Sequence, residues 1–362
     1  SADAQALPIF ARKYKTSCQT CHVAYPKLAP FGEAFRRNNY HFPDGRDEDF
    51  VKIEDVALGA EGYKKVFPRS VWPGAIPGQI GLAAVAIGRL TGAAGGDAKL
   101  NFAGAGGEVQ LTAAGTLGDS VSLWAGIILQ SNLTPENETI NLILHRVFLN
   151  YSLFEKHSLI LRAGRIEPSL FSFSSHRGLF AAYRFLNSMV LDNHFMLEPS
   201  QLGIEATGTL FHRLGYAIGV VEGGGNEVTA PKDVYGGVRY KFGGLALDGS
   251  QPKKNAELLS NPAPWRERSV TLGAFGYRGV ARLKDATTEA FNDDRFLIAG
   301  GDLNAILGDF NLMGVFTFQR NESPKIALPS KPVHTVNGMV QLDWVALPWL
   351  IPMLRYEVQR AG

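Results

Sequence analysis

The sequence has almost no net charge, no long apolar run and very little cysteine, and each shortage excludes a class of protein. Its 36 basic and 34 acidic side chains nearly balance, which gives no charge argument for a nucleic-acid partner. No apolar run reaches the length of a membrane-spanning helix, because candidates such as residues 82–87 are interrupted at Arg89. If this protein spans a membrane, it must therefore do so as a β-barrel.

The only two cysteines lie in the run Cys18-Gln19-Thr20-Cys21-His22. This is the spacing of c-type haem attachment, in which each thiol adds to a haem vinyl group and the histidine binds the iron. A disulfide would leave His22 unexplained, and a zinc site would need two more cysteines or histidines nearby. We therefore predict one covalently bound haem c with His22 as its proximal ligand, and no structural disulfide.

The size of the chain and the place of haem attachment indicate an exported protein with more than a cytochrome in it. At 362 residues the chain is far too long for a lone monohaem cytochrome, and its 40 glycines favour turns and sheets. Haem is attached to c-type cytochromes outside the cytoplasmic membrane, so we expect export. The start at Ser1-Ala2-Asp3 is interpreted as a mature N-terminus.

Residues 1–50 form the predicted haem segment. Apolar side chains recur at helical spacing from Leu7 to Tyr14, and a second helix is predicted from Lys27 to Arg37, ending at Asn38-Asn39. Two short helices bury too little apolar surface to be stable alone, so we expect the segment to dock on the rest of the chain.

The haem motif is flanked by the runs 7–14 (LPIFARKY) and 25–40 (YPKLAPFGEAFRRNNY). Together they resemble the head of the fused monohaem cytochrome–porin family, whose best-known members are cell-surface iron oxidases of bacteria. The resemblance covers the first forty residues and implies an N-terminal haem followed by an outer-membrane β-barrel. It also implies Fe(II) as the extracellular electron donor.

From Gln79 onward, polar and apolar residues alternate in strands, clearest in 201–209, 233–242 and 335–344. Short turns alternate with long connections near 169–200, 243–267 and 320–333, as in outer-membrane barrels. A soluble β-sandwich would show the same alternation, because the pattern does not say which face is inside. Thirteen strands are predicted, starting near residues 79, 105, 120, 140, 157, 201, 213, 233, 268, 294, 308, 334 and 350.

The predicted fold is mainly β, a transmembrane antiparallel β-barrel with a small α-helical monohaem c-type cytochrome segment plugging its lumen. The predicted domains are the haem segment (1–50), a linker or packing segment (51–78) and the barrel (79–362). The loops near 169–200 and 243–267 are expected to close over the haem segment. An odd number of strands cannot close an ordinary bacterial barrel, and the last residues lack the usual terminal aromatic. Either the count is off by one or further strands lie beyond Gly362.

Candidate residues around the haem follow from the side chains near the motif. His41 is the first choice for the distal iron ligand, because it is the only other histidine of the haem segment; the alternatives are Met196 and His194 in the 169–200 loop. Arg36 and Arg37, with Arg12 and Arg177, are candidates for pairing with haem propionates, since arginine offers a carboxylate two parallel donors. Each of these arginines could equally be a solvated surface charge. His157, beside a predicted strand, is interpreted as incidental.

The leading functional hypothesis is outer-membrane electron transfer. A barrel-enclosed haem would accept electrons from an extracellular donor such as Fe(II) and pass them to a periplasmic c-type cytochrome, with outer-membrane lipid around the barrel and no nucleic acid involved. Whether the activity is that of an iron(II) oxidase or of an electron-transfer cytochrome stays open, and no carboxylate cluster offers an iron site. The alternatives are a porin gated or stabilised by its haem plug, and a haem-containing porin subunit of a larger multihaem assembly.

Overall fold

The computed structural model describes the residues given at the end of this paragraph, and the structural statements below refer to them. The chain divides into two compact units, Ser1–Thr16 with Glu48–Asn150 and Ser17–Asp47 with Tyr151–Gly362. The described residues are 9–43, 47, 51, 56–57, 75–76, 81–87, 89–91, 99–101, 108–134, 137–154, 157–174, 183, 190–197, 200–223, 231–250, 261, 263–284, 291–326 and 331–361.

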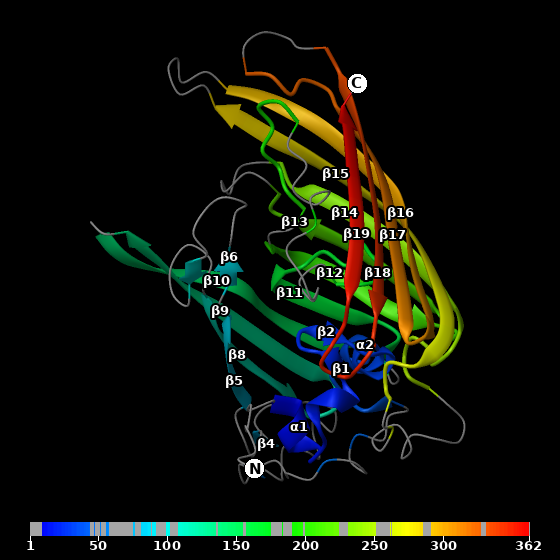
Figure 1. Ribbon diagram of the computed structural model, residues 1–362. Helices are drawn as coiled ribbons and strands as arrows, with labels where there is room; N and C mark the ends of the chain where they lie inside the picture. The colour runs from blue at the N-terminus through cyan, green and yellow to red at the C-terminus, as the bar shows by residue number, and fades with distance from the viewer. Residues whose placement is uncertain are drawn as a thin grey trace, which may run out of the picture. The chain divides into compact units, whose positions relative to one another are not determined.

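Thirteen of the described strands form one antiparallel sheet, in the order β5-β8-β9-β10-β11-β12-β13-β14-β15-β16-β17-β18-β19 (Figure 1). The thirteen predicted strands match these thirteen described strands, and each predicted start lies within three residues of the observed one. The described short strands at 89–91 and 99–101 were not predicted. The strands are β5 (Gly81–Ile87), β8 (Glu108–Leu117), β9 (Val121–Thr134), β10 (Asn137–Ser152), β11 (Ile160–Ile166), β12 (Gln201–Leu210), β13 (Leu214–Val221), β14 (Asp233–Gly243), β15 (Glu267–Lys284), β16 (Phe291–Gly308), β17 (Phe310–Asn321), β18 (Val333–Trp344) and β19 (Met353–Ala361).

Short elements complete the two units. The first unit also has the helix α1 (Ile9–Lys13) and two small strand pairs, β3 (Val56–Ala57) with β4 (Ala75–Ile76) and β6 (Arg89–Thr91) with β7 (Lys99–Asn101). The second has the 3-10 turn η1 (Cys18–Thr20), the pair β1 (His22–Ala24) and β2 (Lys27–Leu28), and the helix α2 (Pro30–Arg37). Apart from 51, 56–57 and 75–76, the predicted linker 51–78 lies outside the described residues. None of the described helices is long and apolar enough to cross a membrane.

In the second unit, the polar face of the sheet is the buried one. Along β14, Asp233 and Arg239 are buried while Val238 and Phe242 on the opposite face are exposed. The same alternation runs along β18, where Gln341 and its polar neighbours are buried and the apolar residues between them are exposed. A soluble sheet does the reverse, since it packs its apolar face on the core. The structure thus identifies the inner face, which the sequence left open.

Several of the buried charges of this face are paired. Arg162 donates to Glu205 at 3.0 Å, and Tyr235 donates to the same carboxylate at 2.7 Å. Lys241 forms an ion pair with Glu267 at 2.6 Å. Such pairing is required, because a buried charge without a partner would cost several kcal/mol.

The long connections are where the sequence predicts them, and the first one folds back onto the polar face. Arg239 donates to the carbonyl of Phe171 at 2.7 Å, and the backbone N–H of Ser172 donates to Asp302 at 2.9 Å. The backbone N–H of Ser169 donates to Glu205 at 2.9 Å. Residues 169–172 are therefore held along the inside of the sheet rather than beyond its edge.

The second predicted helix starts later than expected. Residues 27–28 pair with 22–24 as the strands β2 and β1, so the helix cannot begin at Lys27. It begins instead at Pro30, whose missing N–H costs nothing in the first turn of a helix. Its predicted end is confirmed: Asn38 caps α2, and Asn39 leaves it with a φ of 57°.

Candidate functional site

The two cysteines and His22 occupy a single turn of chain. Cys18 opens η1, and the backbone N–H of Cys21 donates to the carbonyl of Cys18 at 3.2 Å. Residues three apart in a 3-10 turn lie on the same side, so both thiols project from one face. The thiols are not joined to each other; Cys18 is exposed and Cys21 is partly buried. Two thiols on one face, followed at once by a histidine, fit the two vinyl groups and the iron of one haem.

Burial changes the acidity of the Cys21 thiol. Burial, and after it the neighbouring Cys18, raises the pKa of Cys21 to about 12. A free cysteine titrates near 8.5, and it is the thiolate that binds metals and attacks disulfides. The high pKa therefore does not favour disulfide exchange at Cys21.

Helix α2 touches the motif directly at Gly32. A Cβ built on Gly32 would lie 2.0 Å from the carbonyl oxygen of Cys21, well inside any real contact distance. The same carbonyl accepts a hydrogen bond from the backbone N–H of Ala29 at 2.9 Å. Only glycine allows α2 to pack this closely on the turn that carries the thiols.

Replacing Gly32 by alanine should therefore displace α2 from the motif. We expect the variant to lose about 1–3 kcal/mol of stability, as overpacked sites do, and to show a lower ratio of covalent haem to protein. Thermal unfolding and haem staining measure the two effects. Gly314→Ala is the control, because a Cβ there meets nothing closer than 3.8 Å. Equal behaviour of the two variants would contradict the role given to Gly32.

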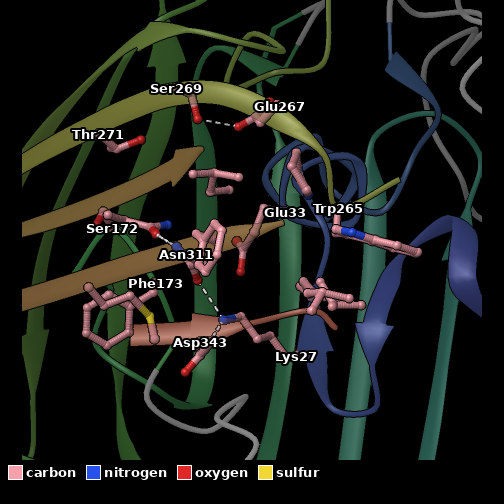
Figure 2. A pocket seen from close by; sticks show the side chains of 18 of the residues that line it. Lys27, Glu33, Ser172, Phe173, Trp265, Glu267, Ser269, Thr271, Asn311 and Asp343 are labelled. Carbon is pink, nitrogen blue, oxygen red and sulfur yellow. Dashed lines mark hydrogen bonds and ion pairs between the residues drawn. The ribbon is translucent and has the colours of Figure 1, made fainter. Parts of the chain in front are cut away.

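Lys27 joins the motif-bearing segment to the far end of the chain. Its ammonium group pairs with Asp343 on β18 and donates to Asn311 on β17 at 2.6 Å (Figure 2). The Asp343 side chain is 1% exposed and that of Lys27 is 15% exposed. Burial lowers the pKa of Lys27, and the adjacent Asp343 opposes that effect by favouring the charged amine. The contact is thus a buried ion pair.

An apolar cluster lies beside this ion pair. Val23 and Ala29 pack with Trp265 and Val345, and Ile351 lies against them. Figure 1 shows β1, β2 and α2 beside the adjoining ends of β18 and β19. The loop before β15 closes on the same segment, since a Cβ on Gly249 would lie 2.5 Å from the Pro43 ring.

His41 is buried and stacked on a second histidine. Its Nδ1 lies 2.8 Å from the carbonyl oxygen of Asn39, and its ring lies 5.1 Å from that of His157 at an angle of 22°. Burial, and after it the nearby His41, lowers the pKa of His157 to about 3, although Asp47 opposes the shift. The position of His157 beside His41 could not be predicted from the sequence, because the two residues are 116 positions apart.

His194 and Met196 lie near one end of the strands, and Lys27 contacts the other end. Asn193 donates to Asp294 at 2.7 Å, and the Phe195 ring lies 4.5 Å from that of Phe296 on β16. Lys27 instead reaches Asn311, which pairs with Ile306 of β16. Ten residues of strand, or about 33 Å, separate the two positions along β16. This distance favours His41 over the two loop residues as the distal ligand.

The arginines proposed for the propionates differ in their partners. Arg36 is paired with Glu33 at 2.9 Å within α2. Arg37 donates to the carbonyl of Ser172 at 3.2 Å. Arg12 lies on α1 in the first unit, and Arg177 is outside the described residues. Within the described part of the chain, no three His, Cys, Asp or Glu side chains are grouped so as to hold a metal ion.

The matches of this chain among known proteins are solved structures of low sequence identity. No family model and no curated protein matches the chain. Among solved structures it is similar to an anion-selective porin from Comamonas acidovorans, with 14% identity and a TM-score of 0.41 over 77% of this chain and 79% of that one. It is also similar to a loop-deletion mutant of OmpT, an outer-membrane protein of Vibrio cholerae, with 10% identity and a TM-score of 0.35 over 78% and 93% of the two chains.

Proposed function

We propose that this protein is an outer-membrane electron-transfer protein of the fused monohaem cytochrome–porin type. The observation that carries the proposal is a c-type haem motif whose segment packs on the buried polar face of a sheet with an exposed apolar face. Neither the motif nor the sheet is explained by a simpler protein class. A soluble cytochrome does not need a sheet with an exposed apolar face, and a simple porin does not need a haem-attachment motif.

The exposed face supports a location in the bacterial outer membrane. Large apolar side chains cover it in the second unit, among them Ile204, Ile218, Val238, Phe316 and Leu354. In water, such an apolar surface would be prone to aggregation, whereas in a bilayer the hydrocarbon chains of the lipid would cover it. Because lipid offers no hydrogen bonds, the sheet would have to close as a barrel, with its polar face around the lumen.

The contacts of residues 23–43 support a plug inside that lumen. Lys27 reaches Asp343 and Asn311 on the polar face, and Arg37 reaches Ser172 of the loop folded against it. Trp265 and Val345 cover the apolar side of the segment. A cytochrome domain tethered outside the barrel would not need these partners.

The residues that would hold the haem are those of the motif and its surroundings. Cys18 and Cys21 would form the thioether bonds, His22 would be the proximal ligand and His41 the distal one. When bound, the haem supplies one-electron redox chemistry between ferrous and ferric iron. The chain's own part is to hold the two thiols on one face, to fix the two histidines and to keep bulk water away from them.

The plug lies at the end of the strands that has more of the short connections, although the long connection 244–266 lies there too. Residues 211–213 join β12 to β13 and Asp309 alone joins β16 to β17, at the same end as Trp344, which pairs with Phe310. In outer-membrane barrels the short turns face the periplasm. This supports a periplasmic c-type cytochrome as the electron acceptor, reached at the end where the plug docks.

The test is electron transfer through the purified protein in detergent. We expect Fe(II) to reduce the haem and a periplasmic c-type cytochrome to reoxidise it, followed by absorbance, with redox-inert Zn(II) as the control ion. A haem that dithionite reduces but Fe(II) does not would exclude iron as the donor. A requirement for other, co-purifying haem proteins would favour the subunit of a larger multihaem assembly.

A further inference from the structure

A cavity lies between α2 and the polar face of the sheet, and both polar and apolar side chains line it. Its volume is about 90 Å³. Lys27, Glu33 and Arg37 line it from the haem segment, Ser172 from the folded loop, and Lys241 and Asn311 from the sheet. Figure 2 shows several of these side chains around the space. This volume can hold a few water-sized groups, such as the carboxylate of a cofactor or of a small solute.

Of the described charged groups that line the cavity, all but one are paired. Lys27 is paired with Asp343, and Lys241 with Glu267. Arg37 makes a single hydrogen bond, to the carbonyl of Ser172. Its Nε is buried and has no hydrogen-bond partner among the described residues, and none of their carboxylates forms an ion pair with it. Of the five N–H donors of the Arg37 guanidinium, one is thus hydrogen-bonded to a described residue.

The surroundings of Arg37 are electrostatically unfavourable for a cation. Burial lowers its pKa well below the usual value, and Arg239 and Arg36 lower it further. Glu33 and Asp302 act in the other direction; Glu33 is paired with Arg36 at 2.9 Å, and one oxygen of Asp302 accepts from the backbone N–H of Ser172 at 2.9 Å. A further anion in the cavity would stabilise this partly buried cation.

We propose that the cavity binds a carboxylate group through the Arg37 guanidinium. The planar guanidinium matches the two oxygens of a carboxylate with parallel donors, and Nε is one of the atoms that would be used. Two sources offer this chemistry: a propionate of the haem, which rests on the function proposed above, and a free carboxylate solute in the lumen, which does not.

The experiment uses the full chain as purified, with Arg37→Gln as the variant. The matched control is Arg282→Gln, because Arg282 is partly exposed and paired with Asp293 on a neighbouring strand. Calorimetric titration with succinate measures binding of a free carboxylate. The reduction potential of the haem, measured from pH 5 to pH 9, reports a propionate.

The two sources give different results. For a free solute, the unmodified protein binds succinate saturably, Arg37→Gln weakens binding at least about tenfold, and the reduction potential does not change. For a propionate, succinate does not bind, and Arg37→Gln lowers the potential and alters its pH dependence. The potential falls because removal of a nearby positive charge favours ferric haem. Arg282→Gln behaves like the unmodified protein in both measurements.

The proposal is overturned if Arg37→Gln changes neither succinate binding nor the potential while the variant stays folded. Should that variant misfold, Arg37→Lys keeps the charge but loses the parallel donors, and it should give an intermediate effect. The succinate titration needs no redox activity. A chain that binds succinate through Arg37 but carries no haem would therefore refute the proposed function and not the carboxylate site.

Discussion

Replacing both Cys18 and Cys21 by alanine is expected to abolish covalent haem attachment. The chain has no other cysteine, so no other thiol can add to a haem vinyl group. We expect haem staining under denaturing conditions to fall to the background of an empty control. The pyridine haemochrome of the unmodified protein should be that of a haem with both vinyl groups saturated.

The sheet should survive this double substitution, because its strands do not depend on the two thiols. Circular dichroism and the shift in gel mobility on heating, which folded outer-membrane barrels show, would report an intact sheet. Single substitutions at either cysteine should leave little haem. Covalent haem in the double variant would disprove the assignment of the motif, whatever the state of the sheet.

Breaking the Lys27–Asp343 pair is expected to release the haem segment from the sheet. Lys27→Met leaves Asp343 buried without its cation, and removal of one partner of a buried ion pair costs about 3–5 kcal/mol. We expect residues 17–43 to lose most of their protection from hydrogen exchange, and the haem to become accessible to external reductants. The effect should be much larger than the loss of one hydrogen bond, because a charge is left in a nearly dry position.

The matched comparison is the partly exposed pair Arg282–Asp293, whose side chains are 34% and 42% exposed. Arg282→Met should change the stability by less than about 1 kcal/mol, as exposed pairs do. The double variant Lys27→Met/Asp343→Leu should recover part of the loss, since it leaves no unpaired charge. If residues 17–43 of the Lys27→Met variant are as well protected from hydrogen exchange as those of the unmodified protein, the ion pair does not hold the segment.

The strands were predictable because their signal is local. Alternation with a period of two and the turn residues between strands can be read in a window of ten positions, and all thirteen strands of the sheet follow from them. The predicted start of α2 at Lys27 is wrong, although the local signal for the true start is present: Pro30 is a residue that favours the first turn of a helix. Which face is buried could not be read, because the alternation is the same for a barrel and a sandwich.

The partners of the haem segment could not be predicted either. Lys27 meets Asp343 across 316 positions, and Trp265 meets Val23 across 242. No pattern within either segment encodes such a pairing, because it depends on where the folded sheet places the ends of its strands. The stacking of the His157 ring on that of His41 is a pairing of the same long-range kind.

The contacts of Lys27 also set the order in which the protein can be assembled. The residue leaves the ribosome early, whereas Asn311 and Asp343 belong to the last strands of the sheet. Closing so long a loop is slow, so the N-terminal segment has to wait for the C-terminal strands before it can seat. During that wait the motif would be accessible to enzymes that attach the proposed haem. Haem attachment would therefore precede burial, and the Lys27–Asp343 ion pair would be among the last contacts to form.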